Sequence, residues 1–255
     1  MKIDDFYERT EVIHEVVEAK RSEICYNLII DLIINEISGK GRKKILDIGC
    51  GDGSFIIRFR KHCEVVGIDI SQKAIDLAKK AGVNVHKVDI SYEKLPFENG
   101  YFDVVYMGDI IEHLLNPDFA ISEVFRVLKS SGFLVLSTPN LASWLNRLLL
   151  LLGMQPRYSE VSTIRSFGRL GRPGSFSVGH LRLFTYAALK EFLTYYRFKI
   201  VNVIGAPCEG LPNLLSMIDG ILSKIPSLSS IVIVVAAKMN KMANQHKVHQ
   251  TLFST

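Results

Sequence analysis

The sequence of 255 residues is poor in cysteine, and its four cysteines are scattered along the chain. Cys25, Cys50, Cys63 and Cys208 show neither the spacing of a metal-binding cluster nor that of a redox pair. The opening residues 1–5 are mostly polar, and they do not resemble a secretory signal. We therefore expect reduced thiols and a cytoplasmic location.

A long uninterrupted apolar run, which a membrane span requires, is also missing. The best candidate covers residues 213–237 and is long enough to cross a bilayer. However, Asp219, Lys224 and Pro226 interrupt it, and charged groups near the centre of a span are costly. We interpret this stretch as a helix, a turn and a buried β-branched strand, with a membrane span as the less favoured alternative.

The charge pattern gives no sign of a nucleic-acid interface. The net charge is only +5, and the chain lacks a continuous basic stripe with interleaved aromatic residues, so nucleic acid is not an expected partner. This mild excess permits an anionic substrate or, at most, peripheral contact with a membrane surface. The composition, with 48% apolar and 22% charged residues, is ordinary for a soluble globular protein, and the length suits one α/β domain with additions.

The chain does contain a glycine-rich turn after an apolar strand pattern, in the run Ile45-Leu46-Asp47-Ile48-Gly49-Cys50-Gly51-Asp52-Gly53. A strand, a glycine turn and a helix form the usual nucleotide-binding corner of an open α/β sheet, because glycine lets a ligand approach the main chain. Dinucleotide dehydrogenases use G-x-G-x-x-G to bind a pyrophosphate, whereas the spacing here is G-x-G-x-G. The carboxylate of Asp47 would repel a pyrophosphate but suit an ammonium or sulfonium group. A nucleotide-dependent oxidoreductase and a purely structural turn are therefore less favoured.

Two further strand patterns also end in an acid. Residues 65–70 carry Asp69, about 20 residues after the first glycine, where a ribose-binding acid is expected in this architecture. Residues 85–90 place Asp89 in a similar way. Any one of these acids alone is explained as a helix N-cap. Three in order, counting Asp47, indicate a ligand site at one edge of the sheet.

Strand and helix patterns alternate along most of the chain, which predicts a parallel sheet with helices on both faces. The predicted strands cover residues 45–48, 65–70, 85–90, 101–107, 133–137, 198–204 and 231–237. The predicted helices cover residues 11–37, 54–62, 72–81, 119–128 and 186–196. We divide the chain into an N-terminal helical extension (1–41), a main domain (42–240) with a lid-like insertion after the fifth strand at about 141–180, and a frayed tail (241–255).

The glycine turn and the acids closely resemble the motifs of the class I S-adenosylmethionine (SAM) methyltransferases, and the resemblance covers residues 43–198. It implies a Rossmann-like, seven-stranded, mostly parallel sheet that binds SAM and releases S-adenosylhomocysteine. It also implies that Asp69 holds the ribose hydroxyls and that Asp89 and Ile90 contact the adenine. The cofactor-binding residues that we expect are Asp47, Gly49, Cys50, Gly51, Gly53, Asp69, Ile70, Asp89, Ile90, Met107 and Gly108.

The segment Gly108–Leu114 resembles the Glu-His-Leu motif that follows the fourth strand in a large group of these enzymes. In the metal-dependent members, which include ubiquinone-pathway O-methyltransferases and small-RNA 2′-O-methyltransferases, an acid-x-x-Glu-His set and a distant histidine bind a divalent cation. The corresponding residues here are Asp109, Glu112, His113 and His180. On a helical turn the first three share one face. A Mg²⁺ ion held there would lower the pKa of a substrate hydroxyl, although those members carry a longer glutamate in place of Asp109.

An interpretation without a metal is also open for this segment. Many methyltransferases that need no metal have Glu-His after the fourth strand, where the histidine lines the pocket and the glutamate caps or forms an ion pair. In that case His113 or His180 is the expected general base, because imidazole titrates near neutral pH.

The residues after the fifth strand carry a second resemblance. The run Ser137–Arg147, the leucines at 148–152 and the segment His180–Thr185 resemble a MetW-like branch of the methyltransferases and enzymes that decorate surface glycans and lipid-linked glycans. We expect the leucine run to be a buried helix face and Trp144 to help cover the acceptor site. The arginines of residues 155–179 suit phosphate or carboxylate groups, although a solvated loop is an equal alternative.

The sequence thus predicts an enzyme that aligns an acceptor atom behind the methyl group of SAM for in-line displacement. The expected acceptor is a small molecule, a glycan or a lipid-linked compound, methylated on oxygen. The alternative is a SAM-binding regulatory or partner protein without turnover of its own. A homodimer is compatible with either interpretation.

Overall fold

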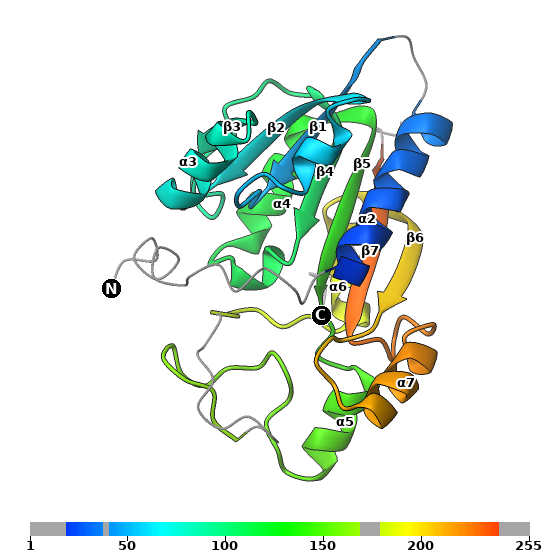
Figure 1. Cartoon of the computed structure of the whole chain (residues 1–255). Helices are drawn as coiled ribbons and strands as arrows, with labels where there is room; N and C mark the ends of the chain where they lie inside the picture. Colours follow the sequence, from blue (N-terminus) through cyan, green and yellow to red (C-terminus); the bar gives the residue numbers. More distant parts are fainter. Residues whose placement is uncertain (1–18, 38–40, 169–178, 240–255) are drawn as a thin grey trace, which may run out of the picture.

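The predicted strands pair into one seven-stranded sheet (Figure 1). The computed structural model describes residues 19–37, 41–168 and 179–239. The strand order is β3-β2-β1-β4-β5-β7-β6. Strands β1 to β5 are parallel, and β7 runs antiparallel to both of its neighbours. The strands are β1 (Lys43–Ile48), β2 (Cys63–Asp69), β3 (Asn84–Lys87), β4 (Phe102–Gly108), β5 (Leu128–Pro139), β6 (Phe198–Ala206) and β7 (Ile231–Lys238).

Helices cover both faces of this sheet (Figure 1). The α-helices are α2 (Ala19–Asp31), α3 (Gln72–Lys80), α4 (Pro117–Val127), α5 (Trp144–Leu151), α6 (Tyr186–Tyr195) and α7 (Asn213–Leu222). The shorter turns are η1 (Leu32–Glu36), which continues α2, η2 (Ile56–Phe59) and η3 (Ile111–His113). Polar N-caps fix where four of the helices begin, because each side-chain oxygen accepts a hydrogen bond from a backbone amide of the first turn. These caps are Ser71, Asn116, Ser143 and Thr185.

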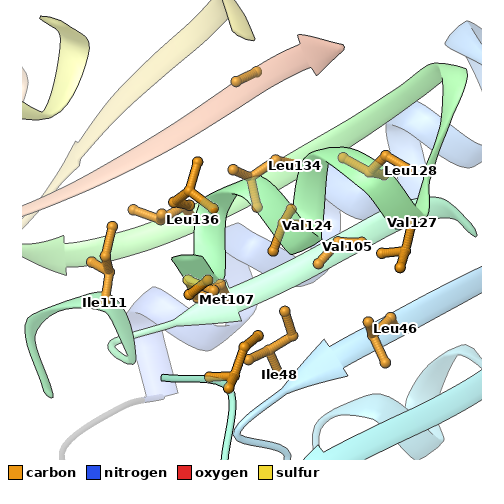
Figure 2. Close-up of a cluster of buried hydrophobic side chains, with 14 of the residues drawn as sticks. Leu46, Ile48, Val105, Met107, Ile111, Val124, Val127, Leu128, Leu134 and Leu136 are labelled. Atoms are coloured by element: carbon orange, nitrogen blue, oxygen red, sulfur yellow. The ribbon is translucent and has the colours of Figure 1, made fainter. Parts of the chain in front are cut away.

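Two apolar cores form because successive strand residues point to opposite faces of the sheet. In β4, Val105 and Met107 face a core shared with α4 and α6, whereas Val104 and Tyr106 face a second core shared with α2 and α3. Figure 2 shows the first core, with Val105 and Met107 packed between the neighbouring strands and helix α4. Strands buried on both faces are typical of parallel sheets.

The strand order places the ligand-binding edge. Connections from β1 proceed outward through β2 to β3, and the chain then returns to the other side of β1 to form β4. Ligands of open α/β sheets bind outside the carboxyl ends of the strands at such a switch point. The residues that follow β1, β2, β3 and β4 therefore meet at one edge.

Most predicted elements are confirmed, including the Rossmann-like seven-stranded sheet. The helix predicted at 186–196 is α6, and Thr185 caps it as expected, 3.1 Å from the amide of Ala188. The apolar stretch 213–237 folds as α7, a turn and β7. No helix within the described ranges is both long enough and apolar enough to cross a bilayer.

Three predicted boundaries are wrong, each for a local reason. The third strand ends at Lys87 rather than residue 90, because Asp89 turns the chain by accepting a hydrogen bond from the Ser91 amide at 2.9 Å. The helix expected at 54–62 contains only the short turn η2. The fifth strand begins at Leu128, so the stop signal expected at 129–132 is part of β5.

The leucine run at 148–152 is not the buried helix face that we predicted. Leu149 is buried, but Leu148, Leu150, Leu151 and Leu152 are exposed. Helix α5 is short, and it packs through Leu145, Asn146 and Leu149, so the other face has no partner in the described part of the chain.

Several predictions fall on residues outside the described ranges. These are the start of the N-terminal helix at 11–18, the turn at 38–40, the lid residues 169–178 with Arg169 and Arg172, and the tail from residue 240. The domain limits that we drew at 41 and 240 remain predictions.

Candidate functional site

The carboxyl ends of four adjacent strands bring the predicted cofactor residues together. The glycine turn follows β1, Asp69 ends β2, Asp89 lies two residues beyond β3, and Gly108 ends β4. Since β3, β2, β1 and β4 are neighbours in that order, these residues line one continuous edge of the sheet.

The three glycines of the turn all have positive φ, with values of 73° at Gly49, 55° at Gly51 and 79° at Gly53. A side chain at Gly49 would collide with Ile110, and one at Gly53 would come within 2.7 Å of Val83. At Gly51, by contrast, an added Cβ would have nothing within 4 Å. Two glycines are therefore required for packing, whereas Gly51 borders open space beside the strand ends.

The carboxylate of Asp69 supports the glycine turn. Its Oδ2 accepts a hydrogen bond from the Gly51 amide at 2.9 Å, and its Oδ1 accepts one from the Ser71 amide at 2.8 Å. Each carboxylate oxygen has a second lone pair that can accept a ligand hydroxyl. Asp69 thus holds the turn that a ligand would approach, and Ile70 follows it, half-buried.

Asp47 is a buried acid at the end of β1, only 3% exposed. Burial is the main cause that raises its pKa well above the ordinary value, and the negative charge of Asp69 raises it further. Cys50 is also buried, and desolvation together with the charge of Asp47 raises the pKa of its thiol, which disfavours the reactive thiolate. A cation that binds here would relieve the repulsion between the two carboxylates.

The remaining predicted cofactor residues offer a ligand more backbone than side chain. Ile90 and Met107 are buried in the first core, so a ligand can reach little beyond their main chain. Gly108 packs against the Tyr106 ring, and Asp89 is half-buried with one oxygen engaged by the Ser91 amide.

Asp109 does not share a helical face with Glu112 and His113, contrary to our prediction. It has a positive φ of 51° and lies before the short turn η3. Its carboxylate forms an ion pair with Arg21 of helix α2 and accepts a hydrogen bond from Ser137 Oγ at 2.9 Å. Arg21 is not among the predicted site residues, because a single basic residue in a helical pattern carries no motif.

Glu112, His113 and His180 do come together. One potential ligand atom from each lies within 4.8 Å of the others, and the two imidazole rings are 4.7 Å apart between centroids. Glu112 is buried, and its Oε2 accepts a hydrogen bond from Thr138 Oγ1 at 3.0 Å. Among the described residues, no other cluster of His, Cys, Asp and Glu has this arrangement.

Backbone hydrogen bonds explain how a histidine so distant in sequence reaches this cluster. The amides of Leu181 and Arg182 both donate to the carbonyl oxygen of Glu112 at 2.8 Å. The Glu160 carboxylate accepts from the amides of Gly179 and His180, at 2.8 and 3.2 Å. Glu160, which sequence analysis also missed, therefore helps to place the His180 loop.

The two histidines are held in the same tautomer. Nδ1 of His113 lies 3.2 Å from the carbonyl oxygen of Gly179, and Nδ1 of His180 lies 2.9 Å from that of Tyr158. A carbonyl oxygen only accepts, so in the neutral ring Nδ1 carries the hydrogen and Nε2 carries the lone pair. Such a lone pair can accept a proton or bind a metal.

This donor set fits a divalent cation, but not every cation equally well. Two imidazoles and one carboxylate suit zinc, iron or manganese, whereas Mg²⁺ prefers oxygen ligands. With Asp109 engaged elsewhere, the cluster has one carboxylate rather than two. The expected Mg²⁺ is therefore the less suitable choice for these residues.

Comparison with known proteins agrees with this geometry. A family profile described as "Methyltransferase domain" matches residues 46–136, from β1 to β5. A ubiquinone biosynthesis O-methyltransferase of Cupriavidus pinatubonensis is 30% identical over 188 residues, which covers 68% of this chain and 76% of the relative. The chain belongs to the class I SAM-dependent methyltransferases. It is accordingly a SAM-dependent methyltransferase enzyme with SAM as its cofactor.

Other relatives match over shorter stretches. A ubiquinone biosynthesis O-methyltransferase of Dechloromonas aromatica is 37% identical over 119 residues, and the chain spans only 51% of its length. Among solved structures, a SAM-dependent methyltransferase of Methanosarcina mazei has a TM-score of 0.59 at 24% identity, covering 84% of this chain and 98% of that one. The structural likeness supports the fold that the sequence predicts.

Proposed function

We propose that this enzyme transfers the methyl group of SAM to a hydroxyl oxygen of a small-molecule acceptor. The observation that carries the proposal is the cluster of Glu112, His113 and His180 beside the strand edge that suits the cofactor. The two parts are joined by Ile110, which precedes η3 and packs against Gly49 of the glycine turn. An acceptor at the cluster would therefore lie next to the bound cofactor.

The proposed cofactor contacts follow from the edge geometry. Asp69 would accept hydrogen bonds from the ribose hydroxyls, and Gly51 would let the cofactor lie against the main chain. Asp89 and Ile90 would flank the adenine. The positive ammonium and sulfonium groups of SAM would favour the charged form of Asp47, which burial alone disfavours.

The reaction needs the acceptor oxygen to be aligned with the methyl group of SAM, and it needs one proton to be removed from that oxygen. The acceptor oxygen attacks the methyl carbon in line with the carbon–sulfur bond, which breaks and leaves neutral S-adenosylhomocysteine. The hydroxyl proton passes to Nε2 of His113 or His180, whose tautomer is set by the carbonyl oxygens behind the rings. Glu112 would stabilise the imidazolium that forms.

A divalent cation is compatible with the same residues. Glu112, His113 and His180 would hold it, and it would lower the pKa of the acceptor hydroxyl. In that case a manganese, zinc or iron ion fits the donor set better than Mg²⁺.

The acceptor class is proposed from the relatives. Three proteins named ubiquinone biosynthesis O-methyltransferase match 38%, 44% and 68% of this chain. We therefore favour a phenolic or quinol hydroxyl, free or attached to a lipid, and place a sugar hydroxyl second.

The test is transfer of a labelled methyl group from SAM to a panel of phenols, catechols and sugars, with and without EDTA. His180→Ala is expected to lower kcat by at least about 100-fold, as expected for loss of a general base, whereas the exposed His62→Ala serves as the matched control. Equal activity of the two variants on every methylated acceptor would contradict the role of the cluster. Activity lost in EDTA and restored by Mn²⁺ or Zn²⁺ would establish the cation.

A further inference from the structure

Helices α5 and α7 lie side by side at one end of the molecule (Figure 1). The Trp144 indole donates a hydrogen bond to the buried Asp219 carboxylate at 2.7 Å, which joins the start of α5 to the middle of α7. The Trp144 amide and the Arg147 guanidinium reach the carbonyl oxygens of Leu228 and Ser227 in the turn after α7. These contacts hold the two helices together as one unit.

This unit exposes large apolar side chains to an unusual degree. On α7, Leu214, Met217 and Ile221 are spaced three and four residues apart and therefore share one helix face, and each is at least 60% exposed. On α5 and its last turn, Leu148, Leu151 and Leu152 share a face in the same way, with Leu151 85% exposed. We call these six residues the α5–α7 apolar surface.

Because α5 and α7 lie side by side, these exposed residues come from two adjacent helices, and exposed apolar residues that gather in this way mark an interaction site. The charges around the α5–α7 apolar surface indicate which partner it fits. Within residues 141–168 and 211–230, the exposed charged residues are Arg147, Arg165 and Lys224, all basic. These segments contain two acids. Asp219 is buried, and Glu160 is half-buried and accepts backbone hydrogen bonds.

We propose that the α5–α7 apolar surface docks on an anionic lipid bilayer. Its apolar side chains would enter the membrane–water interface, and the nearby basic residues would lie toward the lipid headgroups. Amphipathic helices with apolar and basic exposed groups bind anionic membranes in this way. A second copy of the chain fits less well, because a two-fold contact would place the same basic residues of both copies close together. The proposal does not depend on the acceptor, because lipid binding is measured without SAM or substrate.

The experiment is co-sedimentation of the protein with vesicles of phosphatidylcholine alone and of phosphatidylcholine mixed with phosphatidylglycerol. We expect binding that increases with the phosphatidylglycerol fraction and falls at least about tenfold in the double variant Leu151→Glu, Met217→Glu. Leu77→Glu, which replaces an exposed leucine of α3, is the matched control and is expected to bind like the parent protein. Lys224→Glu is expected to weaken binding only to the anionic vesicles.

Two results would overturn the proposal. One is equal binding, or equal absence of binding, by the parent protein and the double variant. The other is a concentration-dependent dimer in light scattering that the double variant abolishes while neither protein binds vesicles, since this would make a second copy the occupant. SAM titration of each variant shows that its fold is intact and keeps this test separate from the proposed methyl transfer.

Discussion

The guanidinium of Arg21 forms an ion pair with the carboxylate of Asp109 across the edge of the sheet. Arg21 comes from helix α2 and Asp109 follows β4, so the pair joins the first described helix to the carboxyl end of β4. Both side chains are largely withdrawn from solvent, at 12% and 19% exposure. Asp109 is held further by Ser137 Oγ and by its own amide, which donates to the Ser137 carbonyl oxygen at 2.9 Å.

The first prediction concerns this pair. Asp109→Asn is expected to lower the free energy of unfolding by about 3 kcal/mol, because it leaves the Arg21 charge buried without its counterion. Urea unfolding of Arg21→Met, Asp109→Asn and the double variant forms a double-mutant cycle. We expect the double variant to lose less free energy of unfolding than the two single variants lose in total. Strictly additive losses would show that the pair contributes nothing to the docking of α2.

The second prediction separates the roles of the glycines. Gly51→Val is expected to abolish SAM binding in calorimetric titration, because the new side chain enters the open space beside the strand ends. Gly153→Val is the control, since Gly153 also has a positive φ, of 69°, with nothing within 4 Å of an added Cβ. Both changes are expected to cost about 1–2 kcal/mol of stability from backbone strain. Full SAM affinity in Gly51→Val would mean that the cofactor lies elsewhere.

The third prediction follows from the raised pKa of Asp47. Folding disfavours its charged form, so stability falls as the pH rises from the unfolded value near 3.8 toward the higher folded pKa. Asp47→Asn removes this cost, and without SAM we expect it to be more stable than the parent protein at pH 7 by at least about 1 kcal/mol. In thermal melting from pH 4 to pH 8, the difference in stability between Asp47→Asn and the parent protein should increase with pH. The same variant should bind SAM more weakly, and a variant less stable at pH 7 would refute the argument.

The fourth prediction concerns Glu123, which accepts hydrogen bonds from Arg126 at 2.7 and 2.8 Å. These bonds are the main cause that lowers the pKa of Glu123, and burial opposes them. Its stabilising contribution is present above the unfolded value of 4.5 and is lost as the pH falls through the lower folded pKa. We expect Glu123→Gln to cost about 2 kcal/mol at pH 7, with a smaller difference in acid. Glu98→Gln, at an exposed position of the loop that Arg126 holds, is the control and should melt like the parent protein at every pH.

The sequence was informative where a residue type answers a strictly local requirement. Glycines that need positive φ and acids at strand ends are such cases, and Gly49, Gly53 and Asp69 lie where the pattern predicts. The pairing of Glu112 with His113 and a distant His180 was predicted from family resemblance, and the structure brings these three together. Their chemical roles remain proposals.

Other features depend on contacts that a local pattern does not contain. The left-handed backbone at Asp109 removes it from the histidine cluster, and its partner Arg21 lies far away in sequence. The leucine run at 148–152 indicates a helix but does not tell whether its leucines have a partner, and most of them are exposed. Met107 lies at a strand end, as expected, but the strand alternation turns its side chain into the core (Figure 2).

The place of β7 inside the sheet has a consequence for synthesis of the protein. β7 is the last strand in the described part of the chain, yet it lies between β5 and β6 and pairs with both. The strands that carry the proposed cofactor-site residues leave the ribosome early and can pair as they emerge, but β5 keeps an exposed edge until residues 231–238 arrive. During that interval an unpaired, apolar strand edge is open to other chains. Truncation before β7 should therefore yield an aggregating fragment, even though the truncated chain still contains the proposed site residues.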